Sequence, residues 1–75
     1  MTRDDLKRVV AANNPNSHVG WEHELARDLQ RMPEDAIAEF FRPTDPMRQV
    51  YRRVIRWAKT QTTEEVEKAL KEVGL

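Results

Sequence analysis

Apolar residues recur every three or four positions along most of the chain, which is the spacing of an amphipathic helix. The clearest pattern runs through residues 47–59. Its apolar side consists of Met47, Val50, Tyr51, Val54 and Ala58. No segment alternates between apolar and polar residues for long enough to predict a strand. The pattern therefore predicts an all-α fold.

Two further helices are expected in the first 32 residues. Thr2 is the expected cap of the first one, whose buried edge is Leu6, Val9 and Val10. The run Asn13-Asn14-Pro15-Asn16 should end it, because proline disfavours helical geometry in the residue before it and asparagine side chains bond to turn backbone. The second helix should begin near Ser17 or Gly20. Its expected buried side is Trp21, Leu25, Leu29 and Met32.

Prolines mark the next two boundaries. Pro33 is expected in the first turn of a third helix, because proline is tolerated there. Its inward residues should be Ile37, Phe40 and Phe41. The turn between Pro43 and Pro46 should be stiff, with Thr44 or Asp45 as the cap of the fourth helix.

The last predicted helix begins at Thr62 or Thr63, and Gly74 should end it. Its apolar line is Val66, Leu70 and Val73. A chain of 75 residues builds one core. We therefore expect a single helical domain over residues 1–75, folded as a compact bundle of about five short helices.

The composition narrows the classes of function. The chain has no cysteine, which excludes disulfides and thiolate zinc sites. No apolar run has the length of a membrane span or the character of a signal peptide. We expect a cytoplasmic protein that does not contact membranes.

Residues for catalysis or metal binding are scarce. His23-Glu24 resembles the start of a zinc-protease helix motif, but Arg27 occupies the position of the second histidine. His18 and His23 are five residues apart, which is poor spacing for one shared metal ion. There is no glycine-rich phosphate loop and no serine flanked by glycines. We expect no enzyme activity, no metal and no cofactor.

Charge is distributed unevenly, although the net charge is zero. Residues 42–60 carry six basic and one acidic side chain, whereas the segments before and after are both acidic. A neutral protein can therefore present a local positive potential to a polyanion. The order of elements, a short helix and a tight turn before the basic helix, loosely resembles a helix-turn-helix unit, but the bulky turn with two prolines departs from that pattern.

The polar side of the helix over residues 46–60 is the predicted binding site, and nucleic acid is the preferred partner because arginine suits phosphates. Trp57 is included because an exposed tryptophan can stack on a base. The candidate residues are Arg48, Gln49, Arg52, Arg53, Arg56, Trp57 and Lys59. Replacing the four arginines by glutamine is expected to abolish binding and to leave the fold largely intact.

Two alternatives stay open. The same helix could bind an acidic or apolar surface of a larger protein, with Tyr51 and Trp57 as anchors. Acidic side chains elsewhere could instead pair with the arginines and leave little charge for any partner. The last helix decides between an open and a closed face, because it carries Glu64, Glu65, Glu67 and Glu72. Whether the protein is a monomer or a homodimer is also left open.

Overall fold

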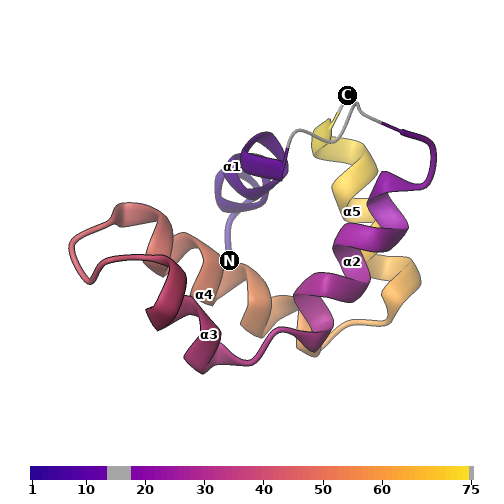
Figure 1. The fold of residues 1–75 in the computed structure, drawn as a ribbon. Coiled ribbons are helices and arrows are strands. Elements are labelled where there is room, and N and C mark those ends of the chain that lie inside the picture. Colours follow the sequence, from indigo (N-terminus) through magenta and orange to yellow (C-terminus); the bar gives the residue numbers. More distant parts are fainter. Residues whose placement is uncertain (14–17, 75) are drawn as a thin grey trace.

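Five helices and no strand make up the described part of the chain, residues 1–13 and 18–74, in a computed structural model (Figure 1). The all-α prediction is therefore confirmed. The helices are α1 (Arg3–Asn13), α2 (Trp21–Arg31), α3 (Glu34–Phe40), α4 (Pro46–Lys59) and α5 (Thr63–Gly74).

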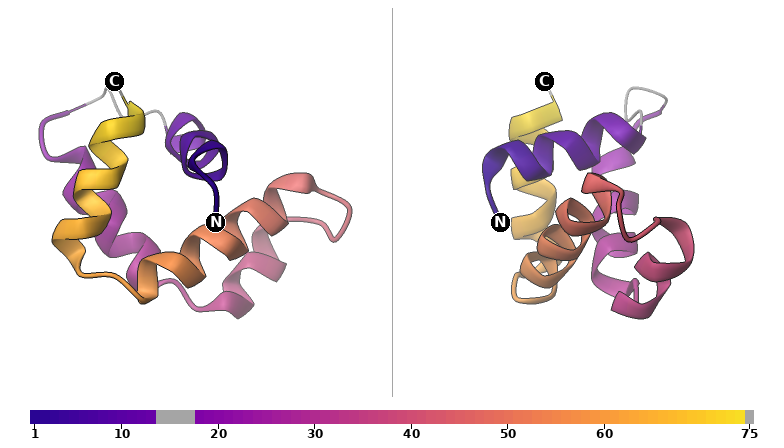
Figure 2. Two further views of the ribbon diagram at one scale, coloured as in Figure 1. Left: turned by 180° about the vertical axis from the view of Figure 1, so that it is seen from behind. Right: turned by 90° about the vertical axis from the view of Figure 1, so that its left-hand side faces the viewer.

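α4 packs on three other helices, α1, α2 and α3, and one of its sides stays uncovered. α2 and α5 lie side by side, and α1 crosses both α5 and α4 (Figure 2). α2 also packs on α4, whereas α3 packs mainly on α4. α4 and α5 are consecutive, but each packs on α1 and α2 rather than extensively on the other.

The core draws on all five helices, and most of the predicted apolar lines contribute to it. Leu6, Val9 and Val10 come from α1, and α3 supplies Ile37 alone. The remaining buried residues are Leu25, Ala26, Leu29, Val50, Val54, Ile55, Ala58, Val66 and Leu70. Ile55 was absent from the predicted line of α4. It is buried because α4 is covered on more than one side.

The prediction for the end of α3 was partly wrong. Phe40 is 74% exposed, although it was expected to point inward. Because α3 has only seven residues and packs on α4, the side that faces α4 is filled by Ile37. Phe41, four positions later, continues that side just beyond the helix and is half-buried. Pro33 was expected in the first turn, but it precedes the helix in an extended conformation.

The predicted caps are present at three helix starts. At α1, the amide of Asp5 donates to Oγ1 of Thr2 at 3.1 Å and Thr2 N donates to the Asp5 carboxylate. Asp45 caps α4 by accepting from the amide of Met47, with Pro46 in the first turn. At α5, Thr62 rather than Thr63 exchanges the same pair of bonds with Glu65.

The start of α2 is different. Gly20 precedes it with a left-handed φ of 86°, a conformation that suits glycine, and no side chain caps the helix. Ser17, the other candidate for this position, lies outside the described residues, as do Asn14, Pro15 and Asn16 of the predicted loop.

Gln30 joins three helices at one half-buried point. Its side-chain amide nitrogen donates to the carbonyls of Ala58 and Gln61, at 3.1 and 2.9 Å. Its oxygen accepts from the hydroxyl of Thr63 at 2.7 Å. The carbonyl of Ala58 is in the last turn of α4, where it also accepts from the amide of Gln61 at 3.2 Å. Gln30 thus satisfies the end of α4 and fixes the start of α5.

Candidate functional site

The polar side of α4 forms a continuous surface that we call the cationic face, made up of Arg48, Gln49, Arg52, Arg53, Arg56 and Lys59. It exists because the opposite side of the helix is anchored in the core by Val50, Val54 and Ala58. Gln49, Arg53, Arg56 and Lys59 are exposed, whereas Arg48 and Arg52 are partly buried. The structure therefore brings six of the seven predicted site residues together.

Trp57, the seventh predicted residue, has a different position. It is half-buried and packs against the core. Trp57, which was expected to stack on a base, is therefore partly covered by the core.

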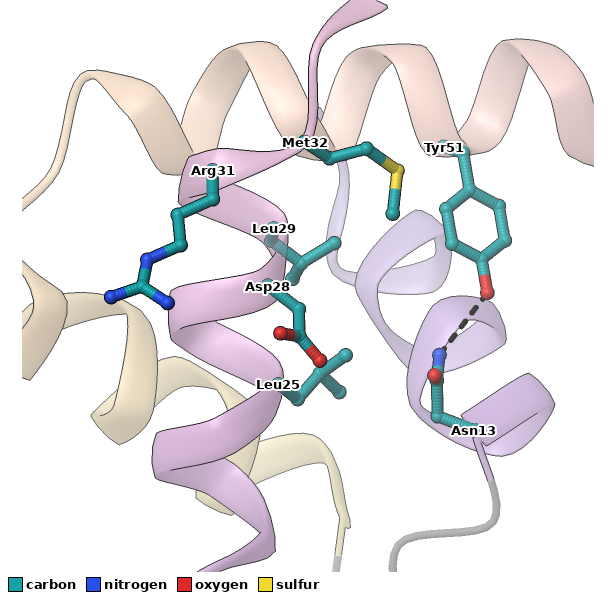
Figure 3. Close-up of a pocket in the computed structure, with 7 residues that line it drawn as sticks. All are labelled: Asn13, Leu25, Asp28, Leu29, Arg31, Met32 and Tyr51. Carbon is teal, nitrogen blue, oxygen red and sulfur yellow. Dashed lines mark hydrogen bonds between the residues drawn. The ribbon is translucent and has the colours of Figure 1, made fainter. Parts of the chain in front are cut away.

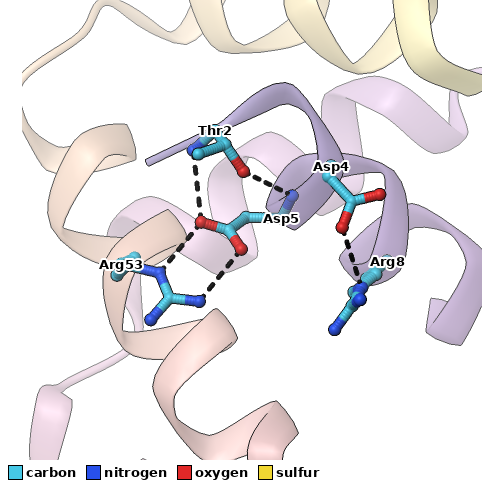
Figure 4. Close-up of polar contacts among 5 residues, drawn as sticks. All are labelled: Thr2, Asp4, Asp5, Arg8 and Arg53. Atoms are coloured by element: carbon cyan, nitrogen blue, oxygen red, sulfur yellow. Dashed lines mark hydrogen bonds and ion pairs between the residues drawn. The ribbon is translucent and has the colours of Figure 1, made fainter.

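Arg53 is paired with Asp5 of α1, as Figure 4 shows. Its Nε and Nη2 donate to the two carboxylate oxygens at 2.9 and 3.0 Å. Asp5 is only 6% exposed, and it also accepts from the amide of Thr2. The hydrogen bonds from Arg53, helped by those from Thr2, hold the pKa of Asp5 well below its usual range. The local sequence does not indicate this role, because Asp5 and Arg53 are 48 positions apart.

Arg56 is paired with Glu34, the first residue of α3. Its Nε lies 2.5 Å from Oε1 and its Nη2 lies 3.4 Å from Oε2. Arg56, followed by the charges of Arg52 and Lys59, lowers the pKa of Glu34. Because both partners are largely exposed, solvent screens the pair and it contributes little to stability. Its main effect is to orient Arg56.

The acidic residues of α5 lie elsewhere. Glu65 caps its own helix, and Glu67 contacts His23 of α2. In the described residues, the carboxylates that pair with the cationic face are therefore Asp5 and Glu34. Five cations against two carboxylates leave an excess of three positive charges on this side of α4. The last helix therefore leaves the cationic face open, and the two ion pairs on this face come from α1 and α3 instead.

Arg48, at the N-terminal end of the cationic face, is only partly satisfied in its hydrogen bonding. Its Nε is buried and has no hydrogen-bond partner among the described residues. An unpartnered buried donor is costly. Nothing else in the structure explains this arrangement.

An aromatic cleft lies on the other side of α4 and was not foreseen from the sequence. Two adjoining cavities of about 260 and 280 Å³ share Asn13, Met32 and Tyr51. Figure 3 shows the residues that line the first of them. The first also borders Leu25, Asp28, Leu29 and Arg31 on α2, and the second borders Ile37, Phe40 and Phe41. We call the two together the aromatic cleft. Its exposed wall is Phe40, whose outward position no sequence pattern indicated.

Tyr51 occupies the centre of the aromatic cleft. Its ring packs on Phe41 with centroids 4.9 Å apart, and its hydroxyl accepts a hydrogen bond from Nδ2 of Asn13 at 3.1 Å. Burial raises the pKa of this hydroxyl. These two contacts hold the Tyr51 ring against Phe41 and Asn13 at the floor of the cleft.

The described residues hold little else for chemistry. Across residues 1–13 and 18–74, no three His, Asp or Glu side chains converge to hold a metal ion. His18 and His23 each lie beside a glutamate, Glu24 and Glu67 respectively. In the same ranges, no helix combines the length and the apolar character that crossing a membrane requires.

Two surfaces therefore stand out for recognition. The cationic face and the aromatic cleft lie on opposite sides of α4, because Gln49 and Tyr51 are about 160° apart around a helix of 3.6 residues per turn. No protein-family model matches the chain, and neither a curated protein nor a solved structure is significantly similar to it.

Proposed function

We propose that this protein is a small, non-enzymatic binding module that binds nucleic acid through the cationic face of α4. The observation that carries the proposal is the position of α5. Glu67 contacts His23 of α2 and Glu65 caps its own helix, and no carboxylate of α5 forms an ion pair with a described residue of α4. A cytoplasmic location and a regulatory role are part of the same proposal.

The spacing on α4 suits a phosphate backbone. Gln49 and Lys59 are ten residues apart, which corresponds to about 15 Å along a helix. Between them, Arg52 and Arg56 lie one turn apart on a shared ridge. A rod of this size fits the major groove of DNA or follows one strand of RNA. With contacts to three or four phosphates, the logarithm of the binding constant should fall against the logarithm of the salt concentration with a slope of about −3 to −4.

The two internal pairs orient arginines for such contacts. Arg53 uses Nε and Nη2 to hold Asp5, and Arg56 uses the same atoms to hold Glu34. The Nη1 group of each has no partner among the described residues. An arginine that is already held in place loses less conformational entropy when a phosphate binds.

A protein partner on the same helix, the alternative from the sequence, has weaker support. Its expected anchors were Tyr51 and Trp57, and both are half-buried against the core. The remaining surface is charged and lacks a large exposed apolar group in the described residues of α4. Such a surface suits a polyanion better than an apolar protein surface.

The test is fluorescence anisotropy of labelled single- and double-stranded DNA and RNA, titrated with the full chain at several salt concentrations. The key variant combines Arg52→Gln with Lys59→Gln, since neither side chain has an ion-pair partner among the described residues. The control combines Arg27→Gln with Lys68→Gln. It removes the same charge from exposed positions on α2 and α5.

We expect saturable binding that weakens steeply with salt, and a loss of about tenfold or more in the key variant but not in the control. Equal losses in both variants would indicate a nonspecific effect of net charge and would count against the cationic face. Absence of binding at low salt would overturn the proposal.

Arg53 must be left out of the variant set. The expectation that all four arginines could be replaced without harm to the fold ignored its contact with Asp5. Removing Arg53 would leave a buried carboxylate without its main partner.

A further inference from the structure

Phe40 is the most conspicuous exposed aromatic residue in the described chain. It is 74% exposed at the end of α3, and it forms part of the wall of the aromatic cleft. Its neighbour Phe41 is half-buried on Tyr51, so only one of the two rings is used in the fold. Leaving a phenylalanine in water forgoes the favourable free energy of burying its ring.

The cleft beside Phe40 has the size and chemistry to take a phenyl ring. The cavity that Phe40 borders measures about 280 Å³ and is lined mainly by Met32, Ile37, Phe41 and Tyr51. A cavity of about 150 Å³ lined by apolar side chains is enough to hold benzene. Methionine and aromatic side chains are also favourable neighbours for a ring. The molecule thus carries a protruding ring and a receptive cavity on one surface.

We propose that the aromatic cleft is the interface of a symmetric homodimer, in which Phe40 of each protomer inserts into the cleft of the other. A twofold interface requires one surface to complement itself. Phe40 and the cleft meet this requirement, because the ring and the cavity belong to the same patch. The proposal does not depend on nucleic-acid binding, since the cationic face lies on the opposite side of α4.

The charges around the patch support a second copy as the occupant. Arg31 and Asp28 line the cleft, and Glu39 and Arg42 flank the two phenylalanines in sequence. None of these four forms an ion pair with another described residue. A patch that meets itself needs both signs of charge, whereas a patch for a strongly charged partner would carry one sign. Two positive and two negative groups therefore fit self-association.

The area that a dimer interface requires is a modest share of the surface. A stable interface of standard size buries roughly 800 Å² per partner. That is about one sixth of the 5107 Å² surface of the described structure. The patch extends over α3 and borders the C-terminal parts of α1 and α2 and the first half of α4.

The experiment is sedimentation velocity of the full chain over a concentration series, with Phe40→Ala as the test variant. Val19→Ala is the matched control, because Val19 is fully exposed and does not line the cleft. Circular dichroism of both variants establishes that they stay helical. Because Phe40 is exposed, its truncation should leave the core intact.

We expect the wild type and Val19→Ala to form dimers with similar dissociation constants. Phe40→Ala should raise the dissociation constant about tenfold or more, because a ring that fills a pocket at the centre of an interface dominates its energetics. A wild type that is monomeric at every concentration would overturn the proposal. A dimer that Phe40→Ala does not weaken would also overturn it, because the interface would then lie elsewhere.

Dilution of the labelled protein in an NMR experiment locates the interface independently. The amide shifts that change with concentration should cluster at Met32, Ile37, Phe41 and Tyr51. Shifts confined to the cationic face would contradict the proposal. A monomer whose cleft instead binds an added amphipathic model peptide would assign the cleft to a different protein and would likewise overturn self-association.

Discussion

Arg53 of α4 and Asp5 of α1 form a two-point contact, with nitrogen-oxygen distances of 2.9 and 3.0 Å, across 48 positions of sequence. Asp5 is at once the capping partner of Thr2, the most buried charged residue described and the link between two helices. One carboxylate therefore couples the start of the chain to the helix that carries the cationic face.

The pH dependence of folding should report this carboxylate. The pKa of Asp5 is lowered in the folded protein, chiefly by Arg53, whereas an unfolded aspartate titrates at about 3.9. Its contribution to stability is thus complete above about pH 5 and is lost as the pH falls through the folded pKa. We expect the free energy of unfolding, measured with urea, to drop steadily in acid.

Asp5→Asn removes the charge and should flatten that acid dependence. At pH 7 the loss should be about 1.5–3 kcal/mol, which is the range for hydrogen bonds to charged groups. The control is Asp4→Asn, since Asp4 is exposed and pairs only with Arg8 in the same helix. If both variants had the same stability at pH 7, the contact between Asp5 and Arg53 would not be important for the fold.

Sequence periodicity was sufficient for the helices and for most of the core. Each apolar line follows from local spacing, and Thr2, Asp45 and Thr62 are caps whose partners lie within three residues. Local rules could not assign Asp5 to Arg53 or Glu34 to Arg56, because those pairs depend on which helices become neighbours.

The aromatic cleft could not be predicted from the sequence for the same reason. A hydrophobic residue in a short helix is expected to be buried, and nothing in the local sequence separates Phe40 from Phe41. The difference arises because α3 packs on α4, so the side with Ile37 and Phe41 is covered and the adjacent side is not. The position of α5, which decides how open the cationic face is, is also a tertiary property.

Gln30 should contribute to the stability of the fold, although its side chain is polar. Gln30→Ala removes three hydrogen bonds and leaves the partly buried carbonyl of Gln61 without this donor, whereas the carbonyl of Ala58 keeps the amide of Gln61. We expect a loss of about 1–3 kcal/mol in urea unfolding. In a domain of this size, each kcal/mol lowers the melting temperature by about 4–8 °C.

Two variants distinguish this role from a general effect of glutamine. Gln49→Ala, on the exposed side of α4, should be close to neutral. Gln30→Glu keeps an acceptor for Thr63 but cannot donate to the carbonyls of Ala58 and Gln61 when ionised. It should therefore destabilise at least as much as Gln30→Ala at pH 7. A neutral Gln30→Glu would show that the two donated bonds contribute nothing.

Gly74 gives a test in which two effects oppose each other. Alanine is the better helix former by roughly 0.5–1 kcal/mol, so propensity alone predicts stabilisation by Gly74→Ala. However, a Cβ at this position would lie 2.7 Å from the Trp21 ring. We expect the clash to dominate, with lower stability and altered Trp21 fluorescence. Lys68→Ala, a change at an exposed position of the same helix, is the control. A more stable Gly74→Ala would show that the indole moves aside at little cost.

Tyr51 is the only tyrosine, so its ionisation can be followed by ultraviolet absorbance. Burial raises its pKa, and the hydrogen bond from Asn13 opposes that shift in part. The folded protein should therefore titrate above 10, whereas the unfolded chain in concentrated urea should titrate near 10. Because the folded state disfavours the ionised phenol, stability should decline as the pH rises above that value.

Asn13→Ala tests the hydrogen bond directly. Without the donated bond, only burial acts on the phenol, so the pKa of Tyr51 should rise further above the wild-type value. If the variant instead opened the aromatic cleft to water, the pKa would fall toward 10. The direction of the shift therefore distinguishes a rigid cleft floor, with Tyr51 held mainly by Phe41 and the core, from one that depends on Asn13 to stay closed. We expect the upward shift, because the ring contact with Phe41 does not involve Asn13.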